Sequence, residues 1–178
     1  MSALKILVIP GSLRSGSLNT KLAAVLAHEL AQSGADVSRI SLGDFPLPIY
    51  DGDLQAKSGV PQHAVNLKRM IGAHHGVLVV TPEYNSSVPA LVKNTIDWVS
   101  RVQDPQEARG QVFRERVFAI AAASGNRLGG IRALAALRLL IEGALGRGDA
   151  IGFTLFYTTS FIFTGLSVAV AFHAGLFN

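Results

Sequence analysis

The chain contains no cysteine among its 178 residues. Disulfide cross-links, thiol nucleophiles and cysteine-based metal centres are therefore excluded. A chain without thiols suits the reducing cytosol, so we expect a cytoplasmic protein. At this length a single domain over residues 1–178 can bury a substantial core without cross-links.

Long runs of like charge, low-complexity linkers and internal repeats are absent as well. The formal net charge is +4, and no basic stripe is interleaved with aromatic residues. This balance indicates anionic small ligands and argues against nucleic acid. His74 and His75 adjoin each other with no third ligand nearby, so we predict no metal site. The apolar run near the N-terminus is too short for a signal peptide.

The first informative loop follows an apolar run, Ile6 to Ile9, which predicts a strand buried on both faces. The run breaks at Pro10-Gly11, passes through small hydroxyl residues and enters a helical pattern near Asn19. Loop N–H groups and the positive end of a helix together form an anion site, and the charge of Arg14 matches a phosphate. The loop contains neither a Walker A motif nor the dinucleotide fingerprint. The alternative is an ordinary strand–turn–helix connection capped by Ser and Asn.

The second loop, T-P-E-Y-N-S-S-V-P over 81–89, follows the predicted strand Gly76–Val80 and leads into a helix over 90–102. Its backbone and the side chains of Glu83, Tyr84 and Asn85 could line the edge of a flat heteroaromatic ring. On the helix, Lys93, Asn94 and Asp97 read better as a polar face and Trp98 as core or interface.

The third loop follows a predicted fourth strand over 116–123 and contains three glycines, Gly125, Gly129 and Gly130. Glycine permits positive φ and close approach of backbone to a ligand. A helix is predicted from Ile131 to about Ile141. Since the carboxyl ends of parallel strands meet at one edge, the three loops should form one site.

The remaining pattern predicts helices over 18–33 and 60–72 and a second strand over 37–42. The stretch 44–61, which contains Pro46, Pro48 and Pro61, reads as a long irregular excursion that either walls the site or connects elements at the surface. The polar stretch 103–116 reads as a surface connection.

These loops resemble those of the NAD(P)H-dependent FMN reductases, which include quinone and chromate reductases, in the flavodoxin-like superfamily. The resemblance rests on G-S-x-R-x-x-S-x-N from Gly11, on T-P-E-Y-N-x-S-x-P-x-x-x-K-N-x-I-D-W from Thr81, and on the Ser124 to Gly130 loop. It implies an α/β flavodoxin-like three-layer sandwich with a five-stranded parallel sheet in the order 2-1-3-4-5. It also implies that FMN phosphate is held by Ser12, Arg14, Ser17, Leu18 and Asn19, and the flavin ring by Pro82, Glu83, Tyr84, Asn85, Ser124, Gly125, Gly129 and Gly130.

The function implied by the resemblance is an FMN-dependent oxidoreductase. Hydride would pass from NAD(P)H through bound FMN to a small acceptor in ping-pong turnover, with free flavin, a quinone, an azo dye or chromate as the acceptor. No side chain needs to act as an acid or base, so none is assigned as catalytic. Similar proteins form a homodimer or homotetramer, which would place Arg127 between subunits. The alternatives are an electron carrier without NAD(P)H activity and a membrane-associated binding protein; Arg14 and the positive net charge argue against the carrier.

The resemblance covers roughly residues 4–142, and the stretch 143–178 is atypical. Residues 150–178 contain no Asp, Glu, Lys or Arg at all. We expect a fifth strand within 151–156 and an apolar helix over 160–172. The Gly, Ser and Thr content favours burial in a subunit interface or disorder over a membrane span. An altered or unnatural C-terminus is the other explanation for this abrupt change in composition.

Overall fold

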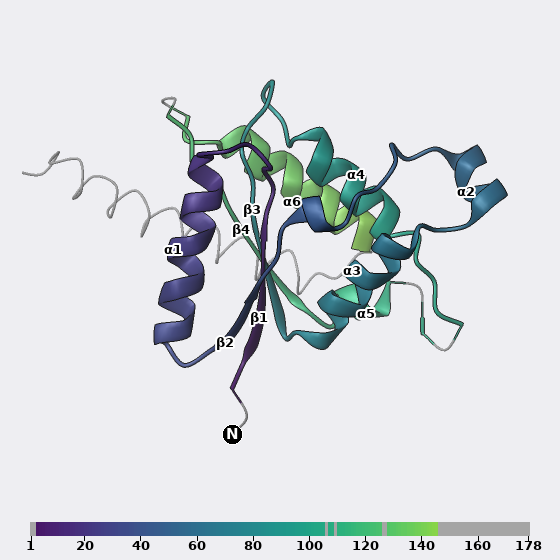
Figure 1. Ribbon diagram of the computed structural model, residues 1–178, viewed down its shortest axis with the longest axis horizontal. Helices are drawn as coiled ribbons and strands as arrows, with labels where there is room; N and C mark the ends of the chain where they lie inside the picture. The colour runs from purple at the N-terminus through teal and green to yellow at the C-terminus, as the bar shows by residue number, and fades with distance from the viewer. Residues whose placement is uncertain (1–2, 106, 109, 126–127, 146–178) are drawn as a thin grey trace, which may run out of the picture.

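The computed structural model describes residues 3–105, 107–108, 110–125 and 128–145. Strands and helices alternate along this part of the chain, as expected for an α/β protein (Figure 1). The elements are β1 (Lys5–Pro10), α1 (Leu18–Gln32), β2 (Asp36–Arg39), the 3-10 helix η1 (Leu42–Asp44), α2 (Gly52–Ser58), α3 (Gln62–Ala73), β3 (Gly76–Val80), α4 (Ala90–Val99), α5 (Gln111–Arg114), β4 (Val117–Ala121) and α6 (Ile131–Leu145).

The four strands form one parallel sheet in the order β2-β1-β3-β4. Every residue of β3 is buried, because this strand has a neighbour on each side and helices cover both faces. The first four positions of the predicted strand order are thereby confirmed. The predicted fifth strand over 151–156 and the helix over 160–172 lie outside the described residues.

The helices divide between the two faces of the sheet (Figure 1). One face packs against α1, with Val8, Leu78 and Val80 facing Ala23 and its helical neighbours. On the other face the alternate strand residues, Leu7, Ile9, Val77 and Val79, form a larger core with α3, α4, α5 and α6. The sheet is thus the middle of three layers, and its strand residues alternate between two cores.

The excursion over 44–61 is more regular than predicted, because η1 ends at its first residue, Asp44, and the seven-residue helix α2 lies within it. Oδ1 of Asp51 accepts hydrogen bonds from the N–H groups of Asp53 (2.8 Å) and Leu54 (3.5 Å), and Gly59, with φ +75°, follows the last turn. None of the helix's residues is buried. Local capping, not apolar periodicity, therefore defines this helix, and a search for periodicity misses it.

Other boundaries also differ from the predictions: the helix predicted over 90–102 ends at Val99, and the strand predicted over 116–123 spans Val117–Ala121. The second strand is shorter than predicted and ends at Arg39, and the connection 103–116 contains the short helix α5. The last helix continues beyond Ile141 to Leu145. The second strand ends early because its pairing with β1 stops at Arg39 and Leu42 already begins η1, so apolar residues continue past the end of the strand.

Helix α4 fastens the excursion to the body of the protein. Trp98, which is fully buried as the core reading predicted, donates from Nε1 to the carbonyl of Pro48 (2.7 Å). Asn94 donates to the same carbonyl (2.9 Å) and accepts from the N–H of Tyr50 (2.8 Å). The ring of Tyr50 stands edge-on to that of Trp98 at 5.1 Å. Asn94, predicted as part of a polar face of this helix, therefore binds the backbone of the excursion over 44–61.

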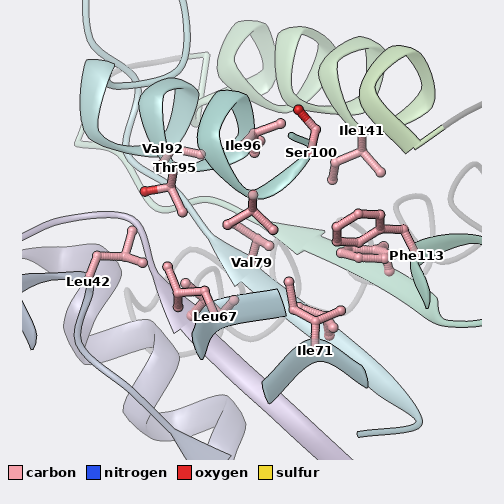
Figure 2. A pocket seen from close by; sticks show the side chains of 14 residues that line it. Leu42, Leu67, Ile71, Val79, Val92, Thr95, Ile96, Ser100, Phe113 and Ile141 are labelled. Carbon is pink, nitrogen blue, oxygen red and sulfur yellow. The ribbon is translucent and has the colours of Figure 1, made fainter. Parts of the chain in front are cut away.

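An apolar cavity of about 60 Å³ lies inside the larger core, between the sheet and helices α3, α4 and α6 (Figure 2). Val79 closes it from the sheet, Ile96 from α4, and Leu67 and Ile71 from α3. Its walls are almost entirely hydrocarbon, so it is a packing void within the core and not part of the loop edge. Among the described residues, no helix has the length and apolar character required to cross a membrane.

Candidate functional site

The loops that follow β1, β3 and β4 lie at the same edge of the sheet, at the top of Figure 1. Two backbone hydrogen bonds extend the strand pairing of the sheet into the first and second of these loops. The N–H of Gly11 donates to the carbonyl of Val80 (2.7 Å), and the N–H of Thr81 donates to that of Ala121 (2.8 Å). A side chain on Gly11 would collide with Val92 of α4 at 2.6 Å, which explains the glycine at the start of the first loop.

The first loop leaves the start of α1 open to an anion. Ser17 is the N-cap residue and is buried, but its side chain makes no capping hydrogen bond. The N–H groups of the first helical turn, beginning with Leu18, therefore keep their donor capacity. Gly16, with φ +71°, allows the tight turn in which the N–H of Ser17 donates to the carbonyl of Arg14 (3.2 Å). This arrangement provides convergent donors.

Arg14 stands beside these donors on the exposed rim of the loop. Its backbone N–H donates to Oγ of the buried Ser12 (3.3 Å), whereas its guanidinium pairs with none of the described residues. The loop thus carries a positive side chain and leads into a positive helix end, with no acidic residue in the first turn of that helix.

Asn19 behaves differently from a free ligand of this anion site. It is 3% exposed, and both ends of its side-chain amide bind the backbone of Ala123. Oδ1 accepts from the N–H of Ala123 at 2.7 Å, and Nδ2 donates to its carbonyl at 2.9 Å. Only the second hydrogen on Nδ2 remains for a ligand. Asn19 therefore joins the first loop to the third.

The second loop projects a tight turn into solvent. Tyr84 and Ser87 exchange two backbone hydrogen bonds, of 2.9 and 3.0 Å. The residues between them, Asn85 and Ser86, both have positive φ, at 49° and 66°. Two left-handed residues in succession define a type I′ turn, in which Asn is favoured and Ser is strained. The strained turn holds Tyr84, 49% exposed, at the rim, while Pro82 is buried beneath it.

The carboxylate of Glu83 turns inward from this loop and pairs with Arg132 in the first turn of α6. The side chain of Glu83 is 2% exposed, and Arg132 donates from Nε at 2.9 Å and also from Nη2. The Arg132 hydrogen bond lowers the pKa of Glu83 below its ordinary value of 4.5, against the opposing effect of burial. Its Oε2 is buried without a partner among the described residues. The ion pair of Glu83 therefore joins the second loop to α6, the helix that follows the third loop.

The third loop requires glycine where it enters α6. Gly129 and Gly130 have φ of +58° and +89°, and a Cβ on Gly130 would lie 2.8 Å from that of Ala122. Ser124 is half-buried and Gly125 is exposed. The backbone here can approach a ligand closely because no side chain intervenes. Arg127, predicted at a subunit interface, lies outside the described residues.

The predicted site residues that the structure describes therefore gather at one edge, but two of their partners were not predicted. Arg132 sits in the first turn of a helix, where a cation is unfavourable unless an acid compensates it. The presence of Arg132 at this unfavourable position was the feature of the sequence that could have indicated an acidic partner. Ala123 takes part only through its backbone, so its side-chain identity carried no signal.

The arrangement fits a flat cofactor with a phosphate tail. The uncapped start of α1 and the unpaired Arg14 suit a phosphate. The backbone at Gly125 and Gly129, where an added Cβ would meet no atom within 4 Å, leaves room for a ring. Because the phosphate donors and the glycine loop meet at one sheet edge, a single ligand can span both.

Comparison with known proteins points the same way. The sequence pattern of the family described as NADPH-dependent FMN reductase matches residues 4–149. A quinone reductase of Escherichia coli K12 is 42% identical over 102 residues, which are 57% of this chain and 53% of that protein. An NAD(P)H-dependent FMN reductase of Pseudomonas aeruginosa is 39% identical over 136 residues, covering 76% of this chain and 68% of that protein. The chain spans about half the length of the quinone reductases it matches.

Among solved structures, the flavoenzyme NAD(P)H:acceptor oxidoreductase FerB from Paracoccus denitrificans superimposes with a TM-score of 0.63 and 31% identity. The superposition covers 80% of this chain and 72% of that one. The flavodoxin-like fold with its parallel sheet is thus shared with a flavoenzyme.

Proposed function

The chain belongs to the NADPH-dependent FMN reductase family, and from this premise we propose that it is an FMN-dependent oxidoreductase. It takes hydride from NAD(P)H and passes it to a small acceptor: a quinone, free flavin, an azo dye or an oxyanion such as chromate. The observation that supports the proposal most directly is the uncapped start of α1 beside the unpaired guanidinium of Arg14. Both features carry positive charge without a partner among the described residues, so an anion is the ligand that they would bind.

The first loop would hold the phosphate of FMN. Ser12, Ser17 and the N–H groups from Leu18 onward supply neutral donors, and Arg14 supplies the charge. We do not count Asn19 among the phosphate donors, because both ends of its side-chain amide already bind the backbone of Ala123. Phosphate binding here positions the rest of the cofactor across the sheet edge.

The other two loops would contact the ring. We assign the backbone from Pro82 to Asn85 to its polar edge, and the backbone from Ser124 through Gly125 to Gly129 and Gly130 to its far side. When bound, FMN supplies the hydride-transfer chemistry that these side chains lack. The loops contribute orientation, since hydride transfer between stacked rings depends on distance and alignment.

No side chain is assigned an acid or base role. Glu83 is the titratable group deepest in the second loop, and its carboxylate is already engaged by Arg132 with its pKa lowered. A carboxylate held ionised in an ion pair is a poor proton donor at neutral pH. Glu83 therefore acts here as a brace.

The absorption spectrum of the purified, FMN-loaded protein tests the proposal. We expect a yellow protein that bleaches anaerobically when NADH or NADPH is added and regains its colour when benzoquinone follows. Bound flavin that dithionite reduces, but neither nicotinamide does, would indicate an electron carrier. Failure to retain FMN at micromolar concentration would contradict the proposal altogether.

A further inference from the structure

We propose that Asn19 couples the phosphate end of the site to its ring end, so that filling one raises the affinity of the other. The inference rests on the proposed flavin-binding function and assigns Asn19 a positioning role. The sequence pattern favours a different role, as a direct ligand of the phosphate. The two roles make different predictions.

The geometry supports a rigid link. Asn19 is the second residue of α1, and Ala123 lies two positions beyond the end of β4. The two hydrogen bonds between them, of 2.7 and 2.9 Å, bridge 104 positions of sequence and use the N–H and the carbonyl of the same residue. Asn19 is almost completely buried, so separating the two segments would leave several polar groups unpaired away from water.

The coupling follows from the binding groups that lie next to each end of this link. The first turn of α1 bears the free N–H groups, whereas Ala123 leads directly into the third loop at Ser124. A phosphate bound at the first turn fixes the backbone of Leu18 and Asn19, and the Asn19 amide then fixes Ala123. A ring that binds afterwards meets a backbone at Ala123 and Ser124 that is already held, so this second step costs less conformational entropy.

The other link between loops does not reach the phosphate end. Glu83 and Arg132 connect the second loop to α6, and Arg132 is 45% exposed. Neither residue contacts α1 through a hydrogen bond or ion pair among the described residues. Among the described residues, Asn19 is a polar side chain through which occupation of the first turn can be transmitted to the start of the third loop.

Riboflavin and inorganic phosphate allow the two ends to be filled separately. Apo-protein is titrated with riboflavin, followed by flavin fluorescence, with and without saturating phosphate. For the native chain we expect phosphate to tighten riboflavin binding at least about fivefold, and riboflavin to tighten phosphate binding by the same factor. In Asn19→Ala this factor should fall below about twofold, while the affinity for phosphate alone changes little.

Asn94→Ala is the matched control. Asn94 also makes two amide hydrogen bonds to backbone, but it joins α4 to Pro48 and Tyr50. It should retain the coupling of the native chain. If Asn19→Ala instead weakens phosphate binding by itself and keeps the coupling factor, Asn19 is a direct ligand and the inference is overturned.

A measurement on the native chain removes any dependence on how the variants fold. Phosphate alone should slow hydrogen exchange at the Ala123 amide, which lies outside the phosphate loop. Unchanged exchange there would overturn the inference even though FMN binds, leaving the proposed function intact. If the native chain binds no FMN at all, the inference and the proposed function fail together.

Discussion

At the scale of single residues, the charge of Arg14 has no partner among the described residues, and this isolation makes its contribution measurable. A charge-assisted hydrogen bond is worth about 1.5–3 kcal/mol. Arg14→Ala should therefore weaken FMN binding by roughly ten- to a hundredfold. Riboflavin affinity should be unchanged, because riboflavin has no phosphate. Lys57→Ala, which removes a positive charge from α2, is the control; equal losses for both flavins would show that Arg14 does not bind the phosphate.

Glu83 makes stability depend on pH. Its pKa is lowered in the folded protein, chiefly by the hydrogen bond from Arg132, whereas the unfolded carboxyl titrates near 4.5. The ionised carboxylate therefore stabilises the fold above that pH, and this stabilisation disappears as the pH falls through the folded pKa. The difference in melting temperature between the native chain and Glu83→Gln should be largest above about pH 5 and shrink as the pH falls below 4.5 through the folded pKa.

Glu142→Gln provides a comparison for Glu83 because it breaks an ion pair within one helix, between Glu142 and Arg138. Such partly exposed pairs contribute little to stability. Its melting temperature should lie closer to that of the native chain throughout the same pH range. A Glu83→Gln difference that stays constant with pH would show that packing, and not charge, makes this side chain important.

At the scale of elements, two glycines at and within α6 should respond to substitution in opposite ways. Gly130 precedes the helix with positive φ and a close neighbour, whereas Gly143 lies inside the helix, where an added Cβ would meet no atom within 4 Å. Gly130→Ala should destabilise the protein by about 1–3 kcal/mol through backbone strain. Gly143→Ala should stabilise it by roughly 0.5–1 kcal/mol. Urea unfolding of both variants checks the pair, and the same sign for both would contradict the geometry.

At the scale of the whole molecule, the two cores should respond differently to one added methylene. Val79 borders the cavity shown in Figure 2, so Val79→Ile can fill space and should add up to about 0.8 kcal/mol of stability. Val8 is fully buried against α1 on the other face and borders no part of that cavity. Val8→Ile should destabilise by about 1–3 kcal/mol. Thermal unfolding distinguishes the two outcomes, and a loss in Val79→Ile would show that the cavity cannot accept the methyl group.

Assembly is the second prediction at this scale. Ile131 and Leu139 are 50% and 68% exposed on α6, eight positions apart and hence on one side of the helix. We expect a homodimer or homotetramer, with Leu139→Lys shifting sedimentation toward monomer. Val25→Lys, at an exposed apolar position on α1, should leave the assembly unchanged. A native chain that sediments as a fully active monomer would contradict this expectation.

The sequence alone determined which segments form the described strands and where the three loops lie, whereas the strand order was implied by the family resemblance. Short apolar runs of β-branched residues identify buried strands, and the glycine and hydroxyl residues that follow them identify the loops. These signals are local, because each depends on residues within a few positions of one another. For the same reason the sequence predicted Trp98 to be a core residue.

Only the tertiary structure decided what the polar side chains of those loops do. Asn19 and Glu83 are both predicted as cofactor contacts, yet their side chains bind Ala123 and Arg132, which are 104 and 49 positions away. Polar groups buried on folding must find partners, and which partners are within reach depends on how distant segments are brought together at the sheet edge. A hydrogen bond to a backbone group, such as that of Ala123, leaves no trace in the identity of the residue that provides it.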